Sequence, residues 1–588
     1  MPGREHSPNG LRMSRERVTR VQFELRPESG GAMANLSPKL PDFDLQEWSA
    51  KPYQERLRMM CRAWALDGFG VPAPIYLFYV LKMALYVLGW AFFVSLGPGH
   101  GWIGDIGNWW REPIAFQKLA LWTLLFEVSG LGGASGPLTA RYVPPIGASV
   151  YWLRPGTTRL PPWPKRVPFT AGTRRSVFDV ALFAALLGLG IWALTQDTLG
   201  RGELLPVVIL LPLIGLRDKT IFLAARAEVH WSYLIVFLFP ADLIAGSKVV
   251  QVAVWWGAAT SKLNHHFPGV VTVMVSNSPF LRSRRIRKAM YRQFPDDLRP
   301  SRIARLLAHG GTAIEYTFPL ILLLSHGGLP TAIGLAMMLS FHSFILFSVP
   351  MGVPLEWNVF TMYTGLFLFG AHADVSIFSV NEPILLVLFA VGLLIGPVLG
   401  NLRPDLVSFL PAMRYYAGNW GASQWIFRKG MEDRLDERIT KVAPTLAKQL
   451  TPMFDEVTAW ALVGRGLAFR AMHLHGRAFN ELMARTVDDI EAYDVRDGEI
   501  IAGIVLGWNF GDGHLHHHQL LAAVQERCEY APGDLRVVFL ESQPLQRQAH
   551  HYTIWDAATG LIEEGDVEIR TLLARQPWEG APAVVPPP

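Results

Sequence analysis

The segment YLIVFLFPADLIAGSKVVQVAVWWGAAT, residues 233–260, is followed directly by SKLNHHF, residues 261–267. The first segment is apolar for longer than the roughly 20 residues that a helix needs to cross a bilayer. We therefore expect a membrane span that ends in a lysine and two histidines. Two roles are open for Lys262: an interfacial anchor beside the neighbouring tryptophans, or a base in a pocket with little water.

The whole chain has the composition of a membrane protein with polar parts attached. Of its 588 residues, 50% are hydrophobic and 18% are charged, whereas soluble domains average about 25% charged residues. Apolar segments recur along the chain and predict an α-helical polytopic membrane protein with about eight or nine spans. The candidate spans are residues 74–97, 114–134, 176–196, 204–224, 231–262, 309–326, 328–349, 355–373 and 382–400.

Lysine and arginine are concentrated in two loops, at residues 154–175 and 281–294. By the positive-inside rule we expect these loops, and both termini, on the cytoplasmic side of the cell membrane. If residues 231–262 cross the membrane once, Lys262 lies near the opposite face. The formal net charge of +5 is small for this length. It therefore favours membrane orientation over nucleic-acid binding.

Changes in polarity divide the chain into five regions. The segment DERITKVAPTLAKQLTPMFDEV is polar and helical in pattern, and short β-rich runs such as LRVVFLES follow it, which predicts a soluble α+β domain at the C-terminal end. Met1 and Met33 are both candidate start residues. The expected regions are a disordered N-terminus (1–42), an amphipathic interfacial helix (43–70), a transmembrane helical domain (71–405), a cytoplasmic domain that is helical and then β-rich (406–575), and a disordered tail (576–588).

Several predicted spans contain ionisable residues, which are costly inside a membrane and usually face a cavity or a partner. Three of them have apolar neighbours on both sides, and this pattern favours a polar pocket inside the bundle: Glu127, Glu315 and His342. For three others, we expect side chains that extend from the ends of spans toward water: Lys82, Asp179 and Lys248.

Four segments occur in an order that matches a known membrane core. RDKTIFLAARAEVHWSYLIVFLF includes Asp218, Lys219 and His230; WWGAATSKLNHHFPG includes Lys262; HGGTAIEYTF includes His309 and Glu315; and SFHSFILFS includes His342. Together they resemble the transmembrane domain of vitamin K-dependent gamma-glutamyl carboxylases, which is the HTTM domain of bacterial relatives. The resemblance covers residues 200–370. The whole chain also resembles an uncharacterised family of actinobacterial transmembrane proteins.

The carboxylase resemblance implies a reaction, a ligand and roles for individual residues. Lys262 would be the base that deprotonates a reduced quinone, with His230 and His342 as acid/base or orienting groups. The implied ligand is a quinone or another lipid-soluble substrate. The remaining pocket residues would be Asp218, Lys219, Glu315, His309 and Glu127.

This chain departs from the carboxylase pattern at two points. After the lysine, NHHFPG stands where those proteins usually have a tryptophan and a glycine, and their large substrate-binding domain is not recognisable here. The fold can therefore transfer without the reaction. The alternative function is a non-catalytic membrane protein for lipid binding, transport or scaffolding, whose C-terminal domain recruits a protein partner.

A histidine-rich segment, GDGHLHHHQ at residues 511–519, lies in the C-terminal region. On a strand, His514, His516 and His518 would point to one face, together with Asp512. No HExxH motif or cysteine partner accompanies them. We therefore assign no metal site.

Overall fold

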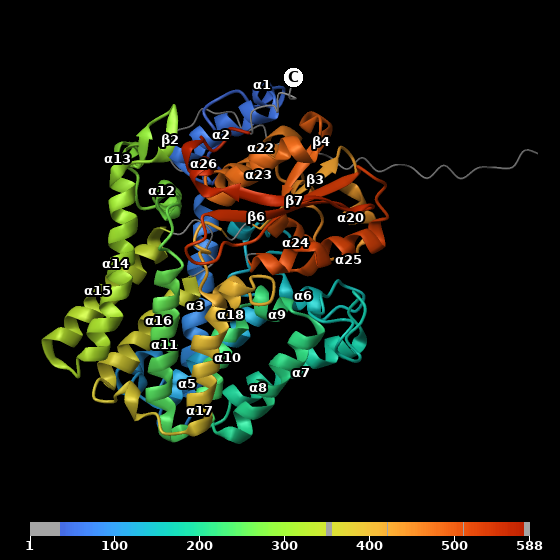
Figure 1. The fold of residues 1–588 in the computed structure, drawn as a ribbon. Coiled ribbons are helices and arrows are strands. Elements are labelled where there is room, and N and C mark those ends of the chain that lie inside the picture. Colours follow the sequence, from blue (N-terminus) through green and yellow to red (C-terminus); the bar gives the residue numbers. More distant parts are fainter. Residues whose placement is uncertain (1–35, 349–354, 420–421, 510, 581–588) are drawn as a thin grey trace, which may run out of the picture.

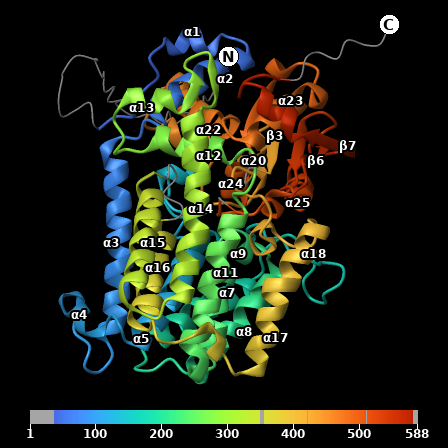
Figure 2. The same cartoon turned by 60° about the vertical axis from the view of Figure 1, so that its left-hand side comes forward.

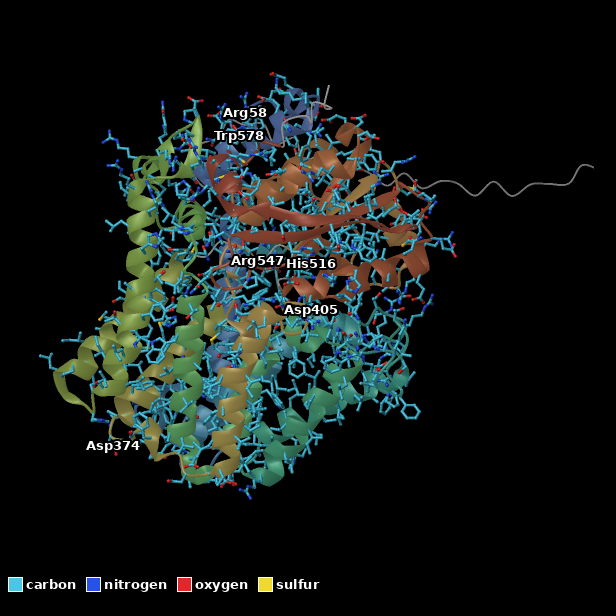
Figure 3. The ribbon with its side chains drawn as sticks, in the orientation of Figure 1. Arg58, Asp374, Asp405, His516, Arg547 and Trp578 are labelled. Carbon is cyan, nitrogen blue, oxygen red and sulfur yellow. The ribbon has the colours of Figure 1, made fainter. Side chains whose placement is uncertain are left out.

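The computed structural model describes residues 36–348, 355–419, 422–509 and 511–580. A bundle of apolar helices forms one end of the molecule, and a β-sheet flanked by helices covers the other end (Figures 1 and 2). Asp374 lies at the bundle end, whereas Arg58 and Trp578 lie at the opposite end, beyond the sheet (Figure 3). The membrane domain and the α+β domain expected from the sequence therefore stack end to end.

Within the described ranges, five helical segments are long and apolar enough to cross a membrane. The predicted count of eight or nine spans is not confirmed. Three predicted spans correspond to shorter helices: α5 (Pro113–Val128), α8 (Arg201–Arg217) and α16 (Leu355–Gly365). The five long segments are α3 (Ala73–Ser95), α7 (Val177–Leu194), α14 (Arg302–Leu324), α15 (Gly328–Ser348) and the continuous segment Pro383–Leu402, which includes α17 (Pro383–Ala390) and α18 (Gly396–Leu402).

The long apolar run around residue 240 is two helices. Helix α10 (Ala227–Phe237) and helix α11 (Leu243–Thr260) meet at an angle of 114°. Pro240 lies at the bend, where it cannot donate a backbone hydrogen bond. The Asp242 carboxylate there accepts the Glu382 backbone N–H (2.8 Å), and so it ties the bend to the start of α17.

This bend corrects the predicted location of SKLNHHF. The segment does not lie at the opposite face from the C-terminal domain, because the run that precedes it turns and does not cross once. Asn264 donates a hydrogen bond to the Ala417 carbonyl (3.4 Å), and the His266 and His550 rings lie 6.4 Å apart. Lys262 therefore lies at the junction of the two domains.

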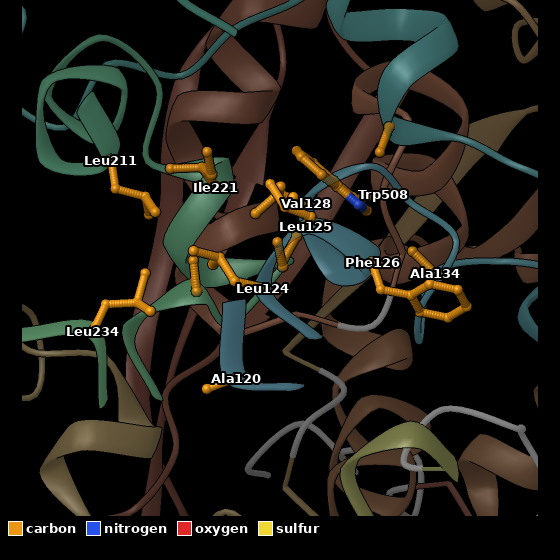
Figure 4. Close-up of a cluster of buried hydrophobic side chains, with 14 of the residues drawn as sticks. Ala120, Leu124, Leu125, Phe126, Val128, Ala134, Leu211, Ile221, Leu234 and Trp508 are labelled. Atoms are coloured by element: carbon orange, nitrogen blue, oxygen red, sulfur yellow. The ribbon is translucent and has the colours of Figure 1, made fainter. Parts of the chain in front are cut away.

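Helix α5 forms the centre of the bundle. Its side chains are buried on every face, as expected for a helix that is apolar all round. Leu124, Leu125 and Val128 pack beside Leu211 and Leu234 of neighbouring helices (Figure 4). Trp508 of the C-terminal domain joins the same cluster (Figure 4). One continuous core therefore connects the bundle to that domain.

The C-terminal domain contains an antiparallel sheet with the strand order β4-β3-β5-β6-β7 among the described residues. Helices α22 (Glu456–Ala471) and α23 (Leu474–Thr486) cover one face, and α24 (Gly498–Leu506) and α25 (His518–Cys528) lie between the sheet and the bundle (Figure 1). The strands are β3 (Ser423–Arg428), β4 (Tyr493–Asp497), β5 (Leu535–Leu540), β6 (Ala549–Asp556) and β7 (Gly560–Glu568).

Residues 43–70 form the short helix α1 (Leu45–Ser49) and the longer helix α2 (Tyr53–Asp67). The apolar side of α2, which includes Met60 and Trp64, is buried against α22 and α12 (Phe267–Asn277). The amphipathic pattern of this segment therefore reflects packing within the protein, and its location at a membrane surface stays a prediction.

The three charged residues expected to extend toward water are instead buried and paired. Lys82 Nζ lies 3.3 Å from Glu356, Asp179 pairs with Arg217, and Lys248 donates to the His372 carbonyl (2.8 Å). Each pairing compensates a charge that would be costly if left alone in an apolar interior.

Two neighbouring histidines on strand β6 allow a test of how the burial of a histidine makes the stability of the protein depend on pH. His550 is fully buried, whereas the neighbouring His551 points to the other face and is partly exposed. Burial lowers the pKa of His550 to about 3. Since an unfolded histidine titrates near 6.5, protonation favours the unfolded state increasingly as the pH falls from 6.5 toward 3, at about 1.4 kcal/mol per pH unit for one such group.

We expect the His550→Phe variant to lose less thermal stability than the native protein between pH 7.5 and pH 5. His551→Phe is the matched control and should keep the native pH dependence. Melting temperatures of the purified full-length proteins at the two pH values provide the measurement. Equal pH dependence in the His550→Phe variant and the native protein would contradict a neutral buried His550.

Candidate functional site

A cavity of about 890 Å³ lies where helices α12, α14 and α15 meet the C-terminal domain. Its wall is mainly apolar, and its size falls within the range of small-molecule sites. Among the apolar lining residues are Val270, Met274, Leu307, Ile314, Met337 and Phe344. Such a lining suits a ligand that is soluble in lipid.

Lys262 lies in this cavity wall. Its side chain is 16% exposed, and Nζ lies 2.5 Å from the carboxylate of Glu315, which is buried on α14. The Phe341 ring lies 5.6 Å from the same Nζ. Because the carboxylate neutralises the ammonium, the pair can remain in apolar surroundings. Of the sequence-predicted site residues, these two are brought together at the cavity.

The C-terminal domain contributes a second charged group to the wall, Glu499, at the start of α24. Arg470 of α22 donates to Glu499 Oε2 (2.6 Å) and also to Asp497. Within the described residues, Glu499 Oε1 has no hydrogen-bond partner. Burial raises the pKa of Glu499 to about 7, against the opposing effect of Arg470.

Arg226 also lines the cavity, immediately before α10. Its backbone has the left-handed conformation (φ 49°), which is uncommon for residues other than glycine. Its guanidinium lies 5.6 Å from the Trp357 ring, and the Trp357 indole donates to Glu127 Oε1 (2.9 Å). Glu127 is therefore linked to the cavity through two side chains, although it does not line it.

Glu127 belongs to a charged cluster inside the bundle that the sequence revealed only in part. Gly133 N–H donates to Glu127 (3.1 Å), and Lys82 pairs with Glu356 and donates to the Gly132 carbonyl (2.7 Å). Glu356 was not among the predicted site residues, because it stands at the start of the predicted span 355–373. Its complete burial could not be read from that position.

The two histidines predicted to act with Lys262 do not line the cavity. His342 Nε2 accepts the Trp255 indole N–H (3.0 Å), and His342 Nδ1 lies 2.8 Å from Asn358 Oδ1. His230 contacts the rings of Trp357 and Phe360, and its nitrogens have no hydrogen-bond partner in the described part of the chain. Their proposed catalytic roles stay predictions.

The other predicted pocket residues also lie away from the cavity wall. Asp218 accepts hydrogen bonds from Arg175 (2.9 Å) and from the Leu160 backbone (3.2 Å), so it organises the basic loop at residues 154–175. His309 is exposed on α14, and Lys219 is partly exposed beside α9 (Thr220–Leu223).

The histidine-rich segment is helical, so the arrangement in which a strand would place His514, His516 and His518 on one face is not present. A 3₁₀ helix, η9 (Gly513–His516), and helix α25 occupy this segment, so the alternation of the histidines has no structural counterpart. His516 Nδ1 lies 2.7 Å from Ser423 Oγ, and His514 Nε2 lies 2.9 Å from Glu541. These histidines connect the helices of the domain to its sheet and to the loop after β5.

The Lys262–Glu315 pair makes a testable contribution to stability. Replacing Lys262 by Met leaves a buried carboxylate without its partner, which should lower the free energy of unfolding by about 3 kcal/mol. The double variant Lys262→Met, Glu315→Leu should regain much of this loss, because no unpaired charge remains.

Denaturant unfolding of the purified proteins in detergent measures both effects. Asp405→Asn, which removes a partner from the exposed Arg403–Asp405 pair, is the control and should change little. A double variant no more stable than the single variant would show that the ion pair is not the source of the loss.

Comparison with known proteins gives one match. No curated protein and no solved structure matches the chain. The model of one family matches residues 33–586, nearly the whole length, and it carries no link to the carboxylases. The chain therefore belongs to the family described as "Transmembrane protein of unknown function (DUF3556)".

Proposed function

We propose that this integral membrane protein binds an amphipathic, lipid-soluble ligand of the quinone type in the 890 Å³ cavity and exchanges a proton with it through Lys262. The observation that carries the proposal is the Lys262–Glu315 pair at a mainly apolar wall. An apolar tail would lie among α12, α14 and α15. Its polar head would contact Lys262, Arg226 and Glu499, the charged side chains that line the cavity.

The paired carboxylate determines how a proton can move. Lys262 Nζ donates to the Glu315 carboxylate (2.5 Å), so this carboxylate is the group positioned to take a proton from the lysine. Transfer of a proton from Lys262 to Glu315 would leave a neutral amine, which can then accept a proton from a hydroxyl group of the ligand. The net result is a ligand oxyanion beside a lysine ammonium, with the ligand's proton equivalent on Glu315. Exclusion of water by the apolar wall favours such an exchange.

The same pairing supports a second candidate function. A lysine held as an ammonium is a fixed positive charge, and a fixed charge can bind an acidic or carbonyl head group without chemistry. This arrangement favours the non-catalytic alternative, a lipid-binding or transport protein with a partner-recruiting C-terminal domain. Ligand binding is common to both candidates, and only turnover distinguishes them.

We also propose a location in the cell membrane with the C-terminal domain on the cytoplasmic side. Support comes from the basic loops, since cytoplasmic loops carry an excess of lysine and arginine. Arg154 donates to the Lys441 carbonyl (3.2 Å), and α13 (Arg284–Ala289) lies at the same end as the sheet (Figure 1).

Filling the cavity tests ligand binding. Gly310 lines the cavity on α14, and a Cβ atom added there meets no heavy atom within 4 Å. We expect Gly310→Phe to reduce the amount of co-purifying ligand at least about tenfold while the protein stays folded. Gly188→Phe, at an equally open position on α7 outside the cavity, is the matched control.

Total lipid extraction from both purified variants, followed by mass spectrometry, provides the measurement. One quinone-type species enriched in the native protein and in Gly188→Phe, but not in Gly310→Phe, is the expected result. Identical bulk phospholipid in all three samples would remove the binding proposal.

A turnover assay distinguishes the catalytic function from the non-catalytic one. With a short-chain naphthohydroquinone in air, we expect Lys262→Ala to lower the rate at which dioxygen oxidises the hydroquinone to the quinone about 100-fold, the size of a typical general-base contribution. Lys165→Ala, at an exposed position of the basic loop, should keep the native rate. Unchanged turnover in Lys262→Ala, or no turnover in the native protein, would favour the non-catalytic function.

A further inference from the structure

A second, smaller cavity of about 290 Å³ lies on the other side of Glu499. It is enclosed by the start of α3, the loop that contains Pro137, helix α22 and the start of α24. The exposed side chains of Leu36 and Met453 lie at its rim. Phe469 and Glu499 line both cavities, so these two side chains form a common wall.

The polar part of the smaller cavity is rich in hydrogen-bond acceptors. Asp497, Glu499 and Asn509 line it together with one cationic side chain, Arg470. The Arg470 Nε and Nη2 groups already donate to the two carboxylates. Glu499 Oε1 and Asn509 Oδ1 are both more than nine-tenths buried, and neither has a hydrogen-bond partner among the described residues.

Two unpartnered acceptors in one cavity are unusual, because most buried polar atoms in folded proteins are hydrogen-bonded. A ligand that donates hydrogen bonds to them would remove the cost of leaving them unpaired. An anionic group would instead lie beside two carboxylates and a single arginine that they share. The rest of the lining, which includes Pro72, Ile75 and Leu462, is apolar and suits the body of a small organic molecule.

We propose that the smaller cavity is a second binding site, for a compact ligand with an apolar body and a hydrogen-bond-donating head group such as a hydroxyl or an ammonium. The head group donates to Glu499 and Asn509. Arg470 and Asp497 hold Glu499 in place from within the C-terminal domain, and Arg226 faces the same carboxylate from the larger cavity. The assignment of this site does not rest on the identity of the ligand proposed for the larger cavity.

Three probes with one body and different heads test this assignment: benzyl alcohol, benzylammonium and benzoate. Binding to the full-length protein in detergent is measured by ligand-observed NMR, with protein-free micelles as the blank. We expect benzyl alcohol or benzylammonium to bind at least about tenfold more tightly than benzoate. Equal or tighter binding of benzoate, or no binding of any probe up to its solubility limit, would overturn the proposal.

Two variants test whether the probes bind in this cavity. Gly466 lines it on α22, and a Cβ atom added there meets no heavy atom within 4 Å, so Gly466→Leu should extend into the site and abolish probe binding. Glu499→Gln presents an amide in place of the carboxylate and should reduce the preference for donor heads over benzoate at least about tenfold. Retained binding and preference in both variants would contradict the assignment.

The controls separate this site from the larger cavity. Gly188→Leu and Glu456→Gln, at exposed or open positions outside both cavities, should keep native probe binding. Gly310→Phe fills only the larger cavity, so it should also leave probe binding intact. Loss of probe binding in Gly310→Phe would show that the probes occupy the larger cavity, and the second site would be rejected.

Discussion

The need to compensate buried charges, with an opposite charge or with backbone carbonyls, recurs throughout this structure. An isolated charge in an apolar interior is so costly that it must find an opposite charge or be neutralised. Lys262 with Glu315, Lys82 with Glu356 and Arg175 with Asp218 are such pairs, and each joins segments far apart in the sequence. These pairs determine which helices lie side by side, and they place charged groups at the cavity and in the centre of the bundle.

The compensation of buried charges also explains which charged side chains lie at the junction of the two domains. Arg470 pairs with two carboxylates at once, and Glu499 and Arg226 face the larger cavity from opposite domains. The two domains therefore meet at the part of the cavity wall that is most polar. A ligand there contacts the bundle and the C-terminal domain together.

Much of the fold was predictable because apolar periodicity and length are local properties. Helices α3, α7, α14 and α15 and the β-rich C-terminal region follow from such patterns. The bend at Pro240 was not predictable, since a proline inside a long apolar run is compatible with both a kinked span and two helices. The bend in turn reversed the expected location of SKLNHHF. The alternation of the histidines at residues 514–518 would have structural meaning only on a strand, and this segment folds as a 3₁₀ helix followed by an α-helix.

Only part of the candidate site could be predicted from the sequence. The residues in that part were ionisable residues that also occur in the order that the carboxylase resemblance requires. Lys262 and Glu315 were both singled out, and the structure joins them. Glu499 and Asn509 gave no signal, because an acid near a strand end and an asparagine after a helix resemble ordinary surface residues. Their significance depends on burial and on the absence of partners, and both are properties of the folded chain.

Glu499 separates two cavities with a single carboxyl group, and this has a thermodynamic consequence. Its charge state and orientation cannot be optimal for two different occupants at once. Any molecule that alters Glu499 from one side therefore changes the affinity on the other side, and the effect must be equal in both directions. Glu499 would thereby couple the cavity in the lipid-facing part of the protein to the cavity in the domain attached to it.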